Sequence, residues 1–121
     1  MEPKPRGWSE RYGSVFRDRA VVELYHLRPP YPPATLDLLA ELASGGPVVD
    51  AGCGPGELSR GLAPRVERVD AVDVSAPMIE RGRCLPGGDA PNLRWFHGRI
   101  EVVELDPPYA LAFAAESVHW F

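Results

Sequence analysis

The stretch over residues 48–56 constrains this chain most, because an apolar run ends there in an acid and then in glycines at every second position, Gly52, Gly54 and Gly56. The apolar run is too short for a helix and indicates the end of a buried strand. Glycine lets the backbone turn tightly and leaves bare peptide for a close contact, because no Cβ stands in the way. An amphipathic segment follows. Strand, glycine turn and helix together are typical of nucleotide pockets at the carboxyl ends of strands in open α/β sheets.

The composition fits one domain of ordinary size. The chain has 121 residues, 45% of them hydrophobic, and a net charge of -4 without a block of like charge. This composition provides enough apolar residues for a core, and it contains no basic cluster of the kind that binds nucleic acid. No run approaches the roughly 18 apolar residues of a membrane span. Residues 1–11 lack the apolar core of a signal peptide, so we expect a cytoplasmic protein that binds neither nucleic acid nor a membrane.

Two cysteines, Cys53 and Cys84, are too few and too far apart for a disulfide framework or a zinc site. Cys53 lies inside the glycine loop, where a small side chain is the simpler interpretation and a reactive thiol is the alternative. The pattern therefore predicts no metal.

The hydrophobic periodicity predicts an N-terminal arm over 1–17 and one α/β domain over 18–121. Helices are expected over 18–27, over 34–43 with Leu36, Leu39, Leu42 and Ala43 on the apolar face, over 57–63, and after the N-cap residue Ser75. Strands are expected over 47–50, 66–73, 93–97 and 109–115, with a turn or short helix over 100–105. Alternating strands and helices with parallel crossovers predict a Rossmann-like, doubly wound sheet of about four parallel strands with flanking helices.

Two acids narrow the choice of nucleotide. The NAD fingerprint G-x-G-x-x-G needs a glycine at position 57, where this chain has Glu57, and Asp50 would repel a bound pyrophosphate. A cationic, phosphate-free cofactor such as S-adenosylmethionine is favoured instead. Asp73, at the end of the second strand, can accept from two ribose hydroxyls. Asp50 as a turn cap and Asp73 as a plain strand-end acid are the alternatives, while Asp70 is expected to be exposed to solvent.

Several segments resemble the class I S-adenosylmethionine-dependent methyltransferases, in particular the small-molecule group called methyltransferase type 11. Residues 48–58 are similar to their first motif, 71–79 to the second, 93–101 to the third, and 109–121 to the fourth strand and its exit. The segment 25–32 is similar to the segment that precedes the first sheet strand in this group of methyltransferases. The resemblance covers the chain from residue 18 onward and implies a strand order of 3-2-1-4.

The resemblance also implies a cofactor site. The glycine loop would line the methionine part, Asp50 would lie near its ammonium group, Asp73 would hold the ribose, and Val74 or Met78 would flank the adenine. Where relatives have Gly-Asp-Ala-Glu, this chain has residues 98–101, so the contact with the adenine amine comes from backbone, from Glu101, or is absent. The candidate cofactor-binding residues are Asp50, Ala51, Gly52, Cys53, Gly54, Gly56, Asp73, Val74, Met78, Arg99, Ile100 and Ala115.

Transfer from a sulfonium asks mainly for alignment of the reactants. His119 follows the fourth strand and either takes a proton from the acceptor or shapes the substrate mouth. Tyr25, Arg28 and Tyr31 form either a lid or a packing cluster. His26 and His97 are interpreted as structural.

The chain ends directly after its fourth predicted strand, whereas the family has seven. It is therefore interpreted as the cofactor-binding, N-terminal part of an enzyme that methylates a small-molecule acceptor. A non-catalytic module that binds S-adenosylmethionine or its product, or docks a partner, is the alternative, and half of an NAD oxidoreductase is disfavoured by Glu57 and Asp50. The edge of the fourth strand would allow a dimer.

Overall fold

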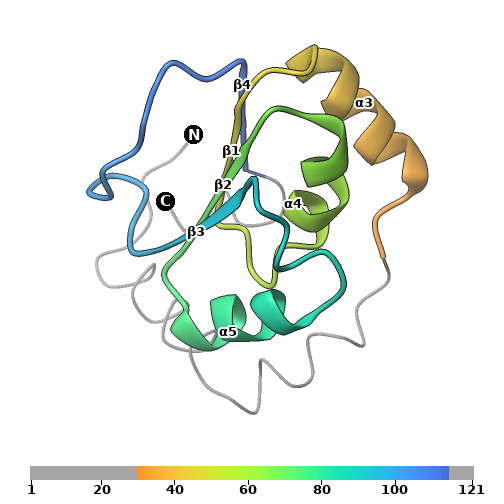
Figure 1. Cartoon of the computed structure of the whole chain (residues 1–121). Coiled ribbons are helices and arrows are strands. Elements are labelled where there is room, and N and C mark those ends of the chain that lie inside the picture. The colour runs from red at the N-terminus through yellow and green to blue at the C-terminus, as the bar shows by residue number, and fades with distance from the viewer. Residues whose placement is uncertain (1–29, 115–121) are drawn as a thin grey trace, which may run out of the picture.

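A computed structural model describes residues 30–114 of the chain (Figure 1). Four parallel strands form one sheet in the order β3-β2-β1-β4. The strands are β1 (Val48–Ala51), β2 (Val69–Asp73), β3 (Leu93–His97) and β4 (Leu111–Phe113). This arrangement confirms the Rossmann-like α/β class and the strand order. The arm over 1–17 and the helix over 18–27 lie outside the described residues.

The described helices are α3 (Pro33–Ala43), α4 (Glu57–Leu62) and α5 (Ala76–Cys84). They lie on one side of the sheet, and the long connection from β3 to β4 passes on the other side (Figure 1). α4 ends at Leu62, one residue before the predicted end of the helix over 57–63, and a 3-10 turn, η2 (Ala63–Arg65), follows it. Strand order reverses at β1, so the carboxyl end of β1 is the switch point at which such sheets bind ligands.

The core lies between the helices and the sheet. The register aligns Val48, Val69 and Leu93 across three strands, and all three side chains are buried. Leu62 at the end of α4 and Ala43 at the end of α3 pack on them. Leu42, predicted on the inner face of α3, is 56% exposed. Its neighbour one turn back, Leu38, is equally exposed, so these two residues form the outer face, while Leu39 and Ala43 form the inner one.

α5 begins as the sequence predicts. Ser75 has extended backbone angles and its hydroxyl accepts from the Met78 N–H at 3.2 Å, which confirms the N-cap. Met78 and Ile79 are buried on the inner side of the helix.

The prediction for Asp70 was wrong, because its side chain is fully buried on the sheet face opposite the helices. Arg94 donates to both carboxylate oxygens, at 2.8 and 2.9 Å, and Arg68 adds a contact of 3.2 Å. The Tyr109 hydroxyl donates as well. Burial alone would raise the pKa of Asp70, but the bonds from Arg94 and Tyr109 and the charges of both arginines lower it below its ordinary value.

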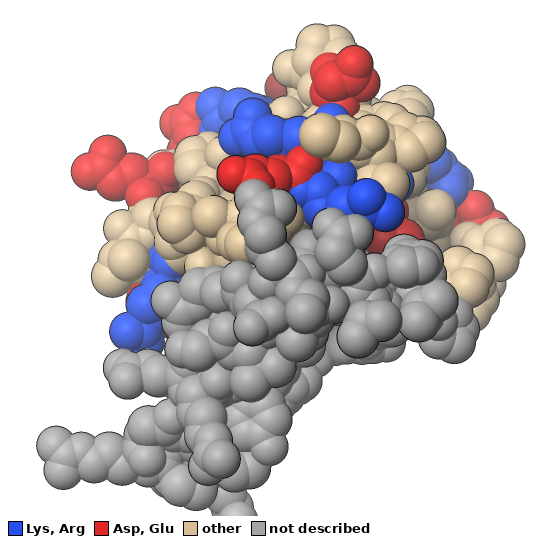
Figure 2. Space-filling model, turned by 90° about the horizontal axis from the view of Figure 1, so that it is seen from below, with Lys and Arg blue, Asp and Glu red and all other residues tan. Residues whose placement is uncertain are grey.

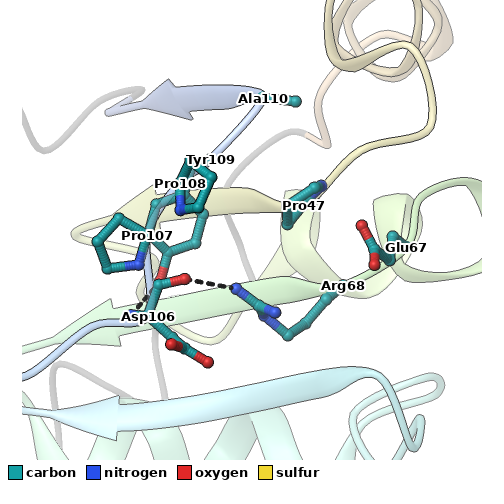
Figure 3. Close-up of a pocket in the computed structure, with 8 residues that line it drawn as sticks. All are labelled: Pro47, Glu67, Arg68, Asp106, Pro107, Pro108, Tyr109 and Ala110. Carbon is teal, nitrogen blue, oxygen red and sulfur yellow. Dashed lines mark hydrogen bonds between the residues drawn. The ribbon is translucent and has the colours of Figure 1, made fainter.

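The Asp70 cluster explains why the fourth strand starts late. Tyr109 turns its side chain to Asp70, and its backbone lies before the ladder, which begins at Leu111 rather than at 109. An open groove of about 550 Å³ lies beside this cluster, at the amino ends of the strands (Figure 3). Arg68 crosses it to the Asp106 carbonyl at 3.1 Å. Ligands of such sheets bind at the opposite, carboxyl ends, so this groove is not the expected cofactor site.

Arg and acidic side chains alternate on the face seen in Figure 2, without a block of one sign among the described residues. Over residues 30–114, no helix is long and apolar enough to cross a membrane. Within the same range, no group of three His, Cys, Asp or Glu side chains could hold a metal ion.

Candidate cofactor-binding site

The glycine loop lies at the carboxyl end of β1 and all three of its glycines adopt left-handed backbone angles. Their φ values are 72° at Gly52, 58° at Gly54 and 75° at Gly56. A side chain at such angles is strained, so glycine is required by the backbone itself. The turn closes with a bond from the Gly56 N–H to the Cys53 carbonyl at 3.0 Å, and α4 starts at the next residue.

The loop is fastened to β2. The Val72 carbonyl accepts from the N–H groups of Gly52 at 2.7 Å and Cys53 at 2.9 Å. The Gly54 N–H donates to Asp73 Oδ2 at 2.8 Å, and the Ser75 N–H donates to Asp73 Oδ1 at the same distance. Asp73 thereby joins the glycine loop to the start of α5.

Asp73 is half-buried, and its carboxylate, which can accept about four hydrogen bonds, keeps room for a further donor beside the backbone N–H groups of Gly54, Ser75 and Val74. Burial raises the pKa of Asp73, and the backbone bonds from Gly54 and Ser75 partly oppose that rise. The His97 ring lies on the neighbouring strand and contacts the Val74 carbonyl at 3.1 Å. This position gives His97 a structural partner, as interpreted from the sequence.

Asp50 lies beneath the loop and is 3% exposed. Its Oδ2 accepts from the Ser59 hydroxyl on α4 at 2.7 Å. Within residues 30–114 this is the one hydrogen bond its carboxylate receives, which leaves Oδ1 buried without a donor. Burial raises the pKa of Asp50 to about 7; the Ser59 bond opposes the rise and the nearby charge of Asp73 adds to it.

The Cys53 thiol donates to the Gly54 carbonyl at 3.3 Å. Burial raises its pKa, and the charges of Asp50 and Asp73 raise it further. The thiolate is the reactive form of cysteine, so this setting favours the interpretation of Cys53 as a small loop residue.

Trp95 of β3 supports the loop from below. A Cβ on Gly56 would meet Trp95 Cη2 at 2.5 Å, and a Cβ on Gly82 of α5 would meet the same atom at 2.4 Å. The indole N–H donates to the Gly88 carbonyl at 3.0 Å. The ring is therefore clamped between the loop, α5 and the loop that follows it.

Glu57 holds the segment before α3. Its Oε2 accepts from the Tyr31 N–H at 2.6 Å, across 26 residues of sequence. This bond places Tyr31 beside the first turn of α4, next to the end of the glycine loop. The acid that replaces the third glycine of the NAD fingerprint thus has a definite structural partner.

Comparison with known proteins identifies this arrangement. The family model described as "Methyltransferase domain" matches residues 48–121, which is more than half of the chain. The chain belongs to the class I S-adenosylmethionine-dependent methyltransferases.

Individual methyltransferases resemble parts of the chain. An uncharacterized methyltransferase of Mycobacterium tuberculosis is 40% identical over 72 residues, 60% of this chain and 35% of that protein. The malonyl-[acyl-carrier protein] O-methyltransferase of Pseudescherichia vulneris is 34% identical over 86 residues, 69% of this chain and 33% of that protein. A solved structure described as a type II methyltransferase, from Anaeromyxobacter dehalogenans, has a TM-score of 0.65 and 38% identity, covering 78% of this chain and 39% of that one. The chain thus spans about a third of the length of the curated methyltransferases it matches.

The structure places the remaining methyltransferase candidates as follows. Val74 is half-buried at the end of β2, whereas the Met78 side chain is 1% exposed and packs in the core. Arg99 pairs with Glu101 at 3.2 Å in an exposed position, and Ile100 lies between them. The candidates Tyr25, Arg28, Ala115 and His119, together with His26, lie outside the described residues.

Three residues around the methyltransferase site were missed at the sequence level: Ser59, Trp95 and Gly82. Gly82 carried a usable signal, since a glycine inside a helix often marks a close packing contact. Ser59 and Trp95 carried none, because their importance depends on which residues of other elements they contact.

Proposed function

We propose that this chain binds S-adenosylmethionine at the carboxyl ends of β1 and β2 and supplies the cofactor-binding part of an enzyme that methylates a small-molecule acceptor. The observation that carries the proposal is the buried Oδ1 of Asp50, which has no donor within residues 30–114. An unpaired buried carboxylate oxygen is costly unless a ligand supplies the missing donor or charge.

The two carboxylates fit the two ends of this cofactor. Asp50 would receive the α-ammonium group of the methionine part, whose N–H groups and positive charge both suit the unpaired oxygen. Asp73, half-buried with free lone pairs, would accept from the ribose hydroxyls. The left-handed glycines present bare peptide between the two acids. When bound, S-adenosylmethionine supplies an electrophilic methyl group on a sulfonium.

The other residues of the site would orient the cofactor and enclose it. We assign the contact with the adenine to Val74, which is half-buried, rather than to Met78, which packs in the core. The Glu57 bond to Tyr31 sets the entry of the segment before α3 against the loop, which is where a lid over the methionine end would be hinged. His119 remains our candidate for shaping the acceptor mouth or taking its proton.

Calorimetric titration of the 121-residue chain with S-adenosylmethionine, S-adenosylhomocysteine and NAD tests the proposal. We expect saturable binding of the first two and none of NAD. Asp73→Asn should weaken that binding, and Asp89→Asn, which changes an exposed loop acid, should not. Binding of NAD alone would refute the assignment.

Methyl transfer is tested separately, because the chain spans a third of its relatives' length. Release of S-adenosylhomocysteine is followed by mass spectrometry with a panel of hydroxyl, carboxyl and amine acceptors. We expect transfer to one acceptor class, and we expect it to depend on Asp73.

A further inference from the structure

We propose that binding of the cationic end of the cofactor is linked to the loss of a proton from Asp50, and that Ser59 is the positioning residue that sets this linkage. The inference rests on the proposed function, since it concerns the same pocket. It assigns a role to Ser59, whose buried hydroxyl no sequence motif singled out.

The geometry around Asp50 is that of an acid lacking a counterion. Ser59 is 0% exposed and donates from α4 to Oδ2 at 2.7 Å, so the hydroxyl holds one oxygen and leaves Oδ1 available. The other titratable groups near Asp50 are Asp73 on β2 and the Cys53 thiol in the loop, neither of which is a cation.

The charged residues of α4 are used elsewhere. Glu57 accepts from the Tyr31 N–H, and Arg60 donates to the carbonyls of Pro55 and Pro86. β4 packs on the other side of β1 with Leu111–Phe113, none of which titrates. Among the described residues, then, no cation meets the Asp50 carboxylate.

A buried acid without a cation holds its proton well above its usual range, and here the pKa is raised to about 7. An arriving ammonium group makes the ionised form favourable. The Asp50 O–H bond then breaks, its electron pair stays on the carboxylate, and the proton passes to the buffer.

The Ser59 hydroxyl donates to the charged form and so opposes the rise in pKa. Without the Ser59 hydroxyl, Asp50 would hold its proton to a higher pH. The ligand would then have to displace this proton over a wider range of pH. The hydroxyl thus positions Asp50 and sets the pH at which the site accepts a cation.

Titration calorimetry of the full chain with S-adenosylhomocysteine, in two buffers of different ionisation enthalpy, measures the protons released per ligand. We expect about half a proton at pH 7 and almost none from Asp50 at pH 8.5. Affinity should fall about tenfold from pH 8.5 to pH 6, because one proton competes with the ligand below its pKa. Asp50→Asn should show neither effect, and it leaves the ligand's own titration unchanged.

5′-Methylthioadenosine is the matched ligand control, since it keeps the adenosine and lacks the amino-acid part. We expect it to bind without the proton release. Ser59→Ala should move the midpoint of the affinity profile to higher pH, and Ser59→Thr, which keeps a hydroxyl, should restore it. A purely structural role for Ser59 would lower affinity equally at every pH.

The two proposals fail differently. Absence of S-adenosylhomocysteine binding at pH 8.5 would refute the proposed function, and this inference with it. Binding of equal affinity at pH 6 and 8.5, without proton release in the unmodified chain, would overturn the linkage alone. Equal proton release with 5′-methylthioadenosine would also overturn it, by assigning the proton to the ribose end. The unmodified chain decides the matter even if Ser59→Ala does not fold.

Discussion

The N–H of Gly54 donates to Asp73 Oδ2 at 2.8 Å, so the loop after β1 and the last residue of β2 form one unit. Asp73 has two tasks in this unit. It holds the peptide of the glycine loop, and it offers its remaining lone pairs at the position where the ribose is expected. A change at Asp73 should therefore affect loop stability and cofactor affinity together.

Asp73→Asn places an amide NH₂ where one carboxylate oxygen now accepts, so either Gly54 or Ser75 loses the acceptor of its N–H. We expect affinity for S-adenosylhomocysteine to fall at least about tenfold, equivalent to about 1.4 kcal/mol. The free energy of unfolding should fall by about 1–2 kcal/mol, because a backbone donor is left unpaired. Calorimetry and urea denaturation measure the two effects, with Asp89→Asn as the neutral control. Unchanged affinity in a destabilised variant would separate Asp73 from the ribose.

Asp50→Asn should stabilise the chain in a pH-dependent way. The folded pKa of Asp50 is raised to about 7 from an ordinary value of 3.8. Between these values the folded chain keeps a proton that the unfolded chain has lost, so the free energy of unfolding falls as the pH rises. A rise of the pKa by about three pH units lowers the free energy of unfolding by about 4 kcal/mol, and this loss is complete above about pH 7.

The asparagine variant has no such proton, and its amide oxygen can still accept from Ser59. The difference in free energy of unfolding between Asp50→Asn and the unmodified chain should therefore grow by a few kcal/mol from pH 4.5 to pH 8, as measured in urea. A difference that is the same at both pH values would contradict the raised pKa.

Gly82→Ala should destabilise the chain although alanine favours helices by about 1 kcal/mol. The new Cβ would meet Trp95 Cη2 at 2.4 Å and the Pro55 carbonyl oxygen at 2.5 Å, and the second of these is backbone beside the glycine loop. We expect a net loss of about 1–3 kcal/mol and a weaker affinity for S-adenosylhomocysteine, because α5 must move away from the loop. Arg83→Ala, exposed on the same helix, is the control. A gain in stability would contradict this prediction, because it would show that the glycine loop moves aside for the new Cβ at little cost.

Arg94→Met should leave the buried Asp70 without its two-point partner. We expect the free energy of unfolding at pH 7 to fall by about 2–3 kcal/mol, in the range for hydrogen bonds to a charged group. The lowered pKa of Asp70 means that its stabilisation is present above the ordinary value of 3.8 and is lost as the pH falls through the folded value. Stability should therefore depend less on pH below about 4 in the variant than in the unmodified chain.

Arg99→Met is the control for this change. It breaks an exposed ion pair with Glu101, and such pairs contribute between about 0 and 1 kcal/mol. Equal losses in the two arginine variants would contradict a special role for the Asp70 cluster.

Local patterns predicted much of the fold. The bounds of β3 were predicted correctly, and so was the Ser75 cap, because in each case the signal is contained in a few neighbouring residues. β2 was predicted to start three residues too early, at 66, and β4 two residues too early, at 109. Val66 and Tyr109 extend the apolar pattern before each ladder, but only pairing with a neighbouring strand decides where a strand begins.

The candidate site likewise contains residues that the local sequence indicates and contacts that depend on other elements of the fold. Asp50, Asp73 and the glycines were proposed from type and spacing, and the structure brings them together at the carboxyl ends of β1 and β2. Asp70 was misjudged because strand alternation correctly predicts the opposite face but says nothing of a partner there. Arg94 and Tyr109, which bury it, come from two other segments.

The sequence by itself determined the class of the fold and the place of the glycine loop at the end of β1, because backbone angles act locally, and its two acids are the basis of the proposed cationic cofactor. The tertiary structure decided how that pocket is held. Ser59 meets Asp50 across a helix, Trp95 is clamped between two glycines of different elements, and Glu57 binds a backbone group 26 residues earlier. Each of these contacts depends on distances between elements, which side-chain packing sets and no local pattern contains.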